Sequence, residues 1–179
     1  MSSGLLLLRV LLAALLFGHA TQKLRGWFGG AGPAGTGAVF ERCGIVPGPR
    51  MVLVAAVAEL TGAASVAAGL LTPGGCAVIV GTMTVAAATT APNGFWALKG
   101  GCEVPFLYGA VAACLGFTGP GEWSLDHLLG LHWRPAPVWG AAALATGLLA
   151  ATVPLARRAA VLRSRGESPD SQGNPPSLG

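Results

Sequence analysis

The sequence predicts an all-α fold, a polytopic bundle of transmembrane helices with four core helices and a fifth helix toward the C-terminus. Two observations predict it. Of the 179 residues, 53% are hydrophobic and only 10% are charged, against about 25% charged residues in a typical soluble domain. The charged residues also cluster between long apolar segments, which is how a membrane protein separates its spans from its connections.

Five apolar segments are candidates to cross a bilayer, which takes about 20 residues of helix. The second and fifth reach this length easily, whereas the third and fourth need flanking residues. Residues 1–155 are therefore predicted to form the bundle, and residues 156–179 a polar, disordered cytoplasmic tail. The predicted spans cover about residues 4–20, 51–71, 76–91, 104–117 and 138–155.

The first segment has a second interpretation as a cleaved signal peptide, because Gly18-His19-Ala20 loosely resembles a small-x-small cleavage site. Two features argue against cleavage: Arg9 interrupts the apolar stretch, and no Lys or Arg precedes it. We therefore expect an uncleaved helix.

Two connections have clear signals. The Gly- and Pro-rich connection 26–50 is long for a bare loop and is predicted to hold a short interfacial helix. Thr72-Pro73-Gly74-Gly75 is predicted to be a tight turn between the second and third spans.

The basic residues predict an orientation. With five spans and a cytoplasmic tail, nine bases face the cytosol, and only Arg9 and Arg134 face outward. The positive-inside rule then places the N-terminus outside and the C-terminus inside a plasma or inner membrane. Because the bases flank apolar segments, the net charge of +4 predicts no nucleic-acid partner. The nine cytosolic bases are Lys23, Arg25, Arg42, Arg50, Lys99, Arg157, Arg158, Arg163 and Arg165.

Glu59 is the polar residue that calls most for an explanation, because it lies within the second span, where a carboxylate is costly. Glu59 either binds a proton or a ligand, or it belongs to a structural ion pair that fixes the register of two helices. Its candidate partners are Arg9 and His19. The predicted polar pocket comprises His19, Gln22, Lys23, Glu59, Asn93 and Glu103. Local alternatives exist for two of them: Lys23 extends to the headgroups, and Glu103 opens the fourth span, where the helix dipole favours a carboxylate.

Other catalytic and metal-binding patterns are absent from the sequence. Cys43, Cys76, Cys102 and Cys114 form no CxxC and no short Cys/His spacing, so no metal site is predicted. We interpret them as small apolar residues and leave a disulfide open. Phosphate-binding loops and the nucleophile motifs of soluble hydrolases are also missing.

Several short blocks together resemble the DoxX family of small membrane proteins. His19-Ala20-Thr21-Gln22-Lys23-Leu24 followed by Gly26-Trp27-Phe28-Gly29-Gly30 is similar to the HGxQK…GWFGG stretch of that family. Further matching blocks keep their order as far as Asp126. They are Ala58-Glu59-Leu60 with Gly62, Pro92-Asn93-Gly94-Phe95, Gly100-Gly101-Cys102-Glu103 with Pro105, and Gly119-Pro120-Gly121 with Ser124-Leu125-Asp126.

The resemblance implies a helical membrane bundle, usually of four spans, and a redox-linked role. Relatives include a subunit of a thiosulfate:quinone oxidoreductase, and some members associate with thiol and oxidative-stress enzymes. The sequence departs from the family at Thr90, where many members have a histidine. It also departs at Cys102 and Val104, where aromatic residues are common.

The leading hypothesis is therefore a redox-linked membrane component, a subunit or accessory that acts on a quinone or on sulfur compounds and thiols. Trp27 and Phe28 are the candidate quinone-lining residues, beside His19, Glu59 and Glu103. Quinone is the one cofactor implied, and the expected partners are the lipid bilayer and membrane or soluble redox proteins. The resemblance does not establish a reaction. Two alternatives stand: a non-catalytic scaffold that recruits partners, and a small-solute transporter, which the lack of an inverted repeat disfavours.

Overall fold

A computed structural model describes residues 2–133 and 136–166, and within these ranges it contains helices and turns but no strand. Five long helices make up the bundle, as the sequence predicts: α1 (Ser2–Arg25), α3 (Gly48–Ala68), α4 (Thr72–Thr90), α5 (Glu103–Thr118) and α7 (Ala136–Gly166). The connections contain α2 (Gly32–Arg42), α6 (Leu125–Leu128) and three short 3₁₀ turns, η1 (Trp27–Gly29), η2 (Ala91–Asn93) and η3 (Ala97–Lys99).

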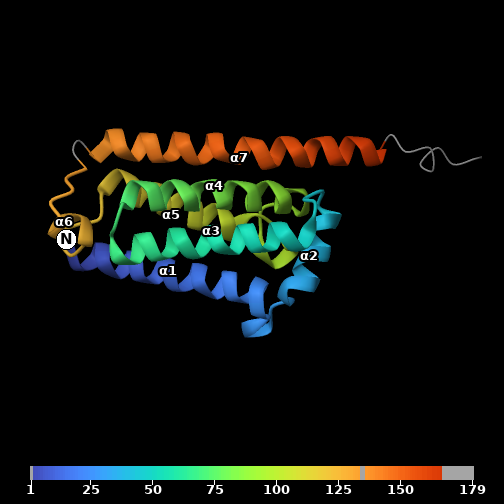
Figure 1. Ribbon diagram of the computed structural model, residues 1–179, viewed down its shortest axis with the longest axis horizontal. Coiled ribbons are helices and arrows are strands. Elements are labelled where there is room, and N and C mark those ends of the chain that lie inside the picture. Colours follow the sequence, from blue (N-terminus) through green and yellow to red (C-terminus); the bar gives the residue numbers. More distant parts are fainter. Residues whose placement is uncertain (1, 134–135, 167–179) are drawn as a thin grey trace, which may run out of the picture.

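The five helices run alternately up and down. In Figure 1, α1 and α7 lie on opposite sides of the bundle, with α3, α4 and α5 between them. Helix α4 is central, because it packs against α3, α5 and α7. The chain starts at the end that carries α6, and α7 finishes at the opposite end, beside α2. These are called the α6 end and the α2 end below.

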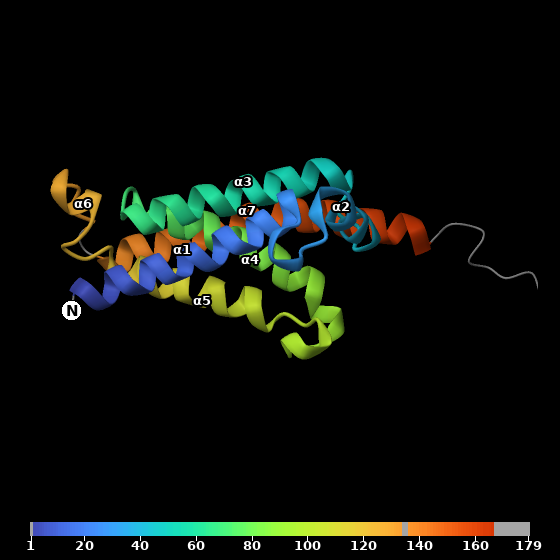
Figure 2. The same ribbon diagram turned by 90° about the horizontal axis from the view of Figure 1, so that it is seen from below.

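Four helices are long and apolar enough to cross a membrane: α1, α3, α4 with its η2 extension, and α7. Helix α5 is apolar but has only 16 residues, which gives a length of about 24 Å. Its first turn follows a connection, Ala91–Cys102, that projects away from the other helices in Figure 2. The all-α transmembrane bundle predicted from composition is therefore confirmed, with α5 as its shortest member.

Helix α3 ends at Ala68, earlier than the predicted limit of residue 71, because Gly69 adopts a left-handed conformation with φ of 63°. A Cβ atom at Gly69 would lie 2.5 Å from the Cβ of Ser124, so the position also has no room for a side chain. The predicted tight turn at 72–75 is wrong. Those residues form the first turn of α4, where Pro73 is suited to a helix start, and Gly69–Leu71 make the turn.

Helix α7 continues to Gly166 instead of ending near residue 155, so residues 156–166 are not part of a disordered tail. Two contacts hold this extension against the short helix that the sequence predicts in the connection 26–50. Arg158 Nε donates to the Cys43 carbonyl oxygen at 2.9 Å, and Arg165 Nη1 donates to the Glu41 carbonyl oxygen at 2.8 Å. The rest of the predicted tail, 167–179, lies outside the described residues, as does Arg134.

Small residues let α4 and α7 approach closely. A Cβ atom at Gly147 would lie 2.6 Å from the Ala77 carbonyl oxygen, and one at Gly81 would lie 3.0 Å from the Gly147 carbonyl oxygen. Lipid gives no hydrophobic drive for helix association, so close backbone packing of this kind stabilises the bundle. The buried core beside it includes Leu12, Leu16, Val66, Ile79 and Leu115.

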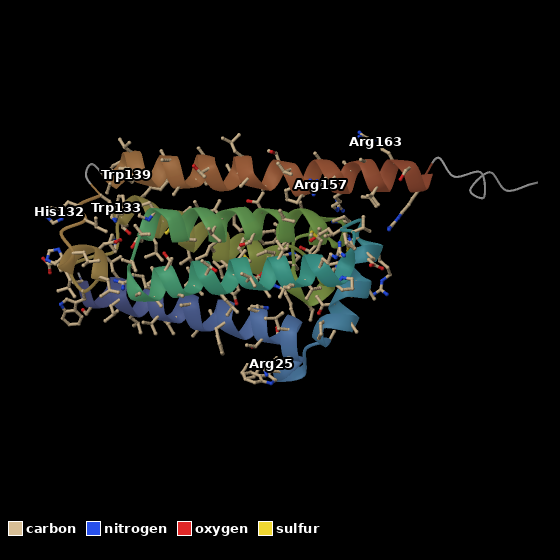
Figure 3. The ribbon with its side chains drawn as sticks, viewed as in Figure 1. Arg25, His132, Trp133, Trp139, Arg157 and Arg163 are labelled. Carbon is tan, nitrogen blue, oxygen red and sulfur yellow. The ribbon has the colours of Figure 1, made fainter. Side chains whose placement is uncertain are left out.

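The five tryptophans form two groups at the two ends of the bundle. Trp123, Trp133 and Trp139 lie at the α6 end, where Figure 3 shows the last two beside each other, with ring centroids 4.9 Å apart. Trp27 and Trp96 lie in connections at the α2 end. Amphipathic aromatic residues collect at the two interfaces of a membrane, so this distribution agrees with a bundle that spans a bilayer.

Candidate functional site

A buried ion pair joins α1 to α3 in the half of the bundle nearer the α2 end. The Lys23 ammonium contacts both carboxylate oxygens of Glu59, with 2.6 Å between Nζ and Oε2. The Glu59 side chain is 3% exposed and that of Lys23 is 22% exposed. Among the described residues this is the one Lys/Arg–carboxylate pair within 4 Å. Lys23 therefore does not simply extend into the headgroups.

Neither Arg9 nor His19, the partners that the sequence suggested, binds Glu59. Helix α1 runs antiparallel to α3, so Arg9 lies level with Val66 and Ala67, about 10 Å along α3 from Glu59. Side chains on a helix also lean toward its N-terminus. Arg9 consequently leans away from Glu59, whereas Lys23, at the far end of α1, leans back toward it.

The ion pair lies in the wall of a large apolar groove. The groove has a volume of about 480 Å³ and follows α4 between α3 and α7, with α2 at the α2 end. Its polar lining is sparse: Lys23, Glu59 and Thr82, Thr89 and Thr90, together with Cys43. Its apolar lining includes Phe40, Met51, Val54, Val85 and Pro154. A mainly apolar groove with a few polar groups in its wall suits an amphiphilic molecule.

The ion pair is the charged hydrogen-bonding group of this groove. The three threonine hydroxyls already use their donors on carbonyls of their own helix, for example Thr90 Oγ1 to the Ala86 carbonyl oxygen at 3.0 Å. Within the described part of the chain, Glu59 is bonded by Lys23 alone. A carboxylate offers about four acceptor positions and an ammonium three donors, so a bound molecule can hydrogen-bond to both groups without breaking the pair.

His19, Gln22 and Phe28 lie together on a second, more open groove of about 250 Å³. Gln22 Nε2 lies 3.4 Å from the Phe28 carbonyl oxygen, and His19 Nε2 lies 3.3 Å from the Tyr108 hydroxyl on α5. Trp27 packs edge-on against Phe28 and under the Arg25 guanidinium. The structure thus brings the predicted quinone-lining residue Phe28 next to His19 and Gln22. Neither Trp27 nor Phe28 lines the larger groove with Glu59.

Asn93 and Glu103 make local contacts in the projecting connection. Asn93 Nδ2 donates to the Gly100 carbonyl oxygen at 3.1 Å, and Glu103 Oε2 accepts a bond from the Ala97 backbone N–H at 2.8 Å. Glu103 is also the first residue of α5. Neither side chain lines either groove, so the structure does not bring them together with Glu59.

Arg9 has a role that the sequence did not indicate. The residue is 1% exposed, and its guanidinium donates to four backbone carbonyl oxygens, at 2.7–2.9 Å. Two belong to the last turn of α3 and two, of Pro120 and Trp123, to the connection before α6. A cation here satisfies carbonyls that a helix end leaves unpaired and complements its dipole. Arg9 is therefore an internal cap at the α6 end of the bundle.

Asp126 performs the complementary task at the start of α4. It is fully buried, and its carboxylate accepts bonds from the Leu71 N–H at 2.7 Å, the Thr72 N–H at 3.0 Å and the Thr72 hydroxyl at 2.7 Å. Its own N–H donates to the Gly69 carbonyl oxygen at 2.8 Å. The one advance signal was that Asp126 belongs to a block that resembles the DoxX family.

The cysteines carry no disulfide, since Cys43, Cys76, Cys102 and Cys114 are all free thiols. Cys76 is fully buried in the core between α4 and its neighbours, as expected for a small apolar residue. Cys43 lines the larger groove.

Long apolar helices, aromatic residues at both ends and helix packing through glycine define a polytopic α-helical integral membrane protein. Comparison with protein families gives the narrower assignment: the DoxX family model matches residues 4–92, and the chain belongs to the DoxX family. The matched region contains Lys23, Glu59 and Thr90 and ends before α5. No curated protein and no solved structure matches the chain.

Proposed function

We propose that this DoxX protein is a redox-linked membrane component that binds a lipid-soluble quinone in the large groove. The observation that carries the proposal is the position of the Lys23–Glu59 ion pair, which lies in the wall of an otherwise apolar groove beside α4. An isoprenoid tail matches the apolar lining. A quinone ring carries two carbonyl oxygens, and the Lys23 ammonium has a hydrogen-bond donor left to bind one of them.

In this proposal each member of the pair has a separate task. Lys23 donates a hydrogen bond to one quinone carbonyl and orients the ring. Glu59 holds or releases a proton, because reduction of a quinone to a quinol consumes two electrons and two protons. Electrons come from a sulfur compound or thiol through a partner protein, as the family resemblance implies. Thr90 replaces the histidine of many relatives and lies on the same groove, so proton exchange depends on Glu59.

The proposal includes an orientation in a plasma or inner membrane, with the N-terminus outside and the C-terminus in the cytosol. The chain begins and α7 finishes at opposite ends of the bundle (Figure 1). Nine of the described Lys and Arg residues belong to the α2 end. Arg9, at the α6 end, is buried and bonded to backbone carbonyl oxygens. The positive-inside rule favours the α2 end in the cytosol.

The test is quinone binding and reduction by full-length protein in lipid nanodiscs. We expect the purified protein to retain a menaquinone or ubiquinone analogue. We also expect reduction to depend on an added donor such as thiosulfate, together with co-purifying partners. Glu59→Gln keeps the Lys23 donor but removes the proton-exchanging carboxyl group, so it should lower the rate of quinone reduction at least tenfold while retention changes little.

The matched control is Glu122→Gln, which changes an exposed carboxylate at the α6 end that bonds only Ser2 Oγ. It should leave both retention and reduction unchanged. A wild-type protein that neither retains nor reduces quinone, alone or with co-purifying partners, would contradict the proposal. The non-catalytic scaffold would then be the better description.

A further inference from the structure

A second feature of the α2 end is a set of exposed arginines with no partner in the protein. Arg42, Arg50 and Arg157 are all exposed. In the part of the chain that the structure describes, none of them makes a side-chain hydrogen bond or an ion pair with a carboxylate. We call these three residues the arginine cluster. They come from three segments: the end of α2, the start of α3 and the last turns of α7.

Contacts between these three segments fix the segments relative to one another. Arg158 and Arg165 of α7 bond to the carbonyl oxygens of Cys43 and Glu41, the residues that flank Arg42. The Glu41 carboxylate accepts a bond from the Gly48 N–H at the start of α3, at 2.9 Å, which fixes the segment that carries Arg50. Figure 3 shows Arg157 on the side of α7 nearer to the other helices, whereas Arg163 lies on the opposite side of α7 and is not part of the cluster.

The local charge is strongly positive. These three segments carry six arginines, counting Arg158, Arg163 and Arg165, and Glu41 is their one carboxylate among the described residues. Glu41 is already engaged in capping α3. Arginine guanidinium groups bind phosphate well, and basic clusters directly beyond a transmembrane helix attract anionic lipids.

The cluster also adjoins apolar surface. Met51 and Pro154, which line the large groove, lie one and three positions from Arg50 and Arg157 in the chain. A ligand that suits both surfaces has a phosphate next to acyl chains. We propose that the arginine cluster binds the phosphate headgroup of an anionic phospholipid whose chains lie along the α2 end of α3 and α7. This inference is independent of the quinone proposal.

The test compares the affinity of the full-length protein for spin-labelled phosphatidylglycerol and phosphatidylcholine in liposomes, measured as relative association constants. Wild-type protein should prefer phosphatidylglycerol. The double variant Arg42→Gln/Arg157→Gln should lower that preference about fivefold or more, because each arginine at an anionic surface adds appreciable affinity. Circular dichroism checks that the exposed substitutions leave the helices intact.

The control is Arg25→Gln/Lys99→Gln, which removes the same charge from the same end but outside the cluster. It should leave most of the preference intact; an equal loss in both variants would mean general surface charge and overturn the proposal. A second arm adds sn-glycerol 3-phosphate at millimolar concentration, which should not displace the lipid. Displacement would indicate a site for soluble phosphate and would also overturn it.

Discussion

Both ends of the bundle bury charged groups, but the protein satisfies the hydrogen-bonding capacity of those groups to different degrees. At the α6 end, Arg9 donates to four carbonyl oxygens and Asp126 accepts three bonds, all from the protein itself. Toward the α2 end, Lys23 and Glu59 bind each other and face an apolar groove. A saturated buried charge holds architecture together. A buried charge with free hydrogen-bonding capacity beside a groove can hold a ligand.

The comparison also explains how one connection, that between α3 and α4, is stabilised. The end of α3 presents unpaired carbonyls and the start of α4 presents unpaired N–H groups. Arg9 satisfies the former and Asp126 the latter, so each charge lies where the helix dipole favours its sign. Gly69 leaves room for this arrangement, because a Cβ atom at position 69 would lie only 2.6 Å from Arg9 Nη2.

The largest expected effect is at the α6 end. Arg9→Leu removes four hydrogen bonds and leaves buried carbonyl oxygens unpaired, each at a cost of about 1–3 kcal/mol. We expect Tm in detergent to fall by about 10 °C or more, or folded protein not to be recovered. Arg9→Lys, which keeps the charge with fewer donors, should lie between this variant and wild type. An exposed control, Arg163→Leu, should change stability by less than about 0.5 kcal/mol. Equal stability of Arg9→Leu and wild type would mean that Arg9 is not a structural cap.

The Lys23–Glu59 pair should give a smaller and recoverable loss of stability. Lys23→Met leaves Glu59 buried without its partner and should cost about 3 kcal/mol. The double variant Lys23→Met/Glu59→Leu should regain most of that stability, because apolar side chains replace a buried pair at little cost. Thermal unfolding measures this recovery. Quinone retention should stay low in the double variant, and its return together with stability would show that the pair only fixes helix register.

The sequence was sufficient to predict the helices but not their contacts. Apolar run length predicted the five long helices, and the depth of Glu59 in a span marked it as a residue with a partner or a ligand. Its partner depends on how far α1 is shifted along α3 and on the lean of each side chain, neither of which a hydropathy pattern contains. The same shift placed Arg9 against the end of α3, where its acceptors are backbone carbonyls that no sequence motif reveals.

Contacts between residues close in the chain were easier to predict from the sequence than contacts between distant residues. The bonds of Asn93 and Glu103 lie within a few residues in the chain, and the alternative that Glu103 serves the start of α5 agrees with the structure. Asp126 caps Thr72 across 54 positions, and a separation of that size leaves no local signal. The extension of α7 to Gly166 likewise depends on carbonyl oxygens of the distant helix α2.

The smallest effect on stability, and the most direct test of the groove, comes from filling it. Ala150 lines the groove on α7, and its neighbour Leu149 is 68% exposed and does not line it. Ala150→Phe should occupy space along the proposed path of the quinone tail and weaken quinone retention about tenfold. Leu149→Phe adds similar bulk to the outer face and should have no effect on retention. Both should keep Tm within about 2 °C of wild type, since neither alters the α4–α7 glycine contacts. If the two variants retain quinone equally, the molecule does not bind along α7, and the ion pair would have to meet its ligand from the α1 side, where His19 and Phe28 lie.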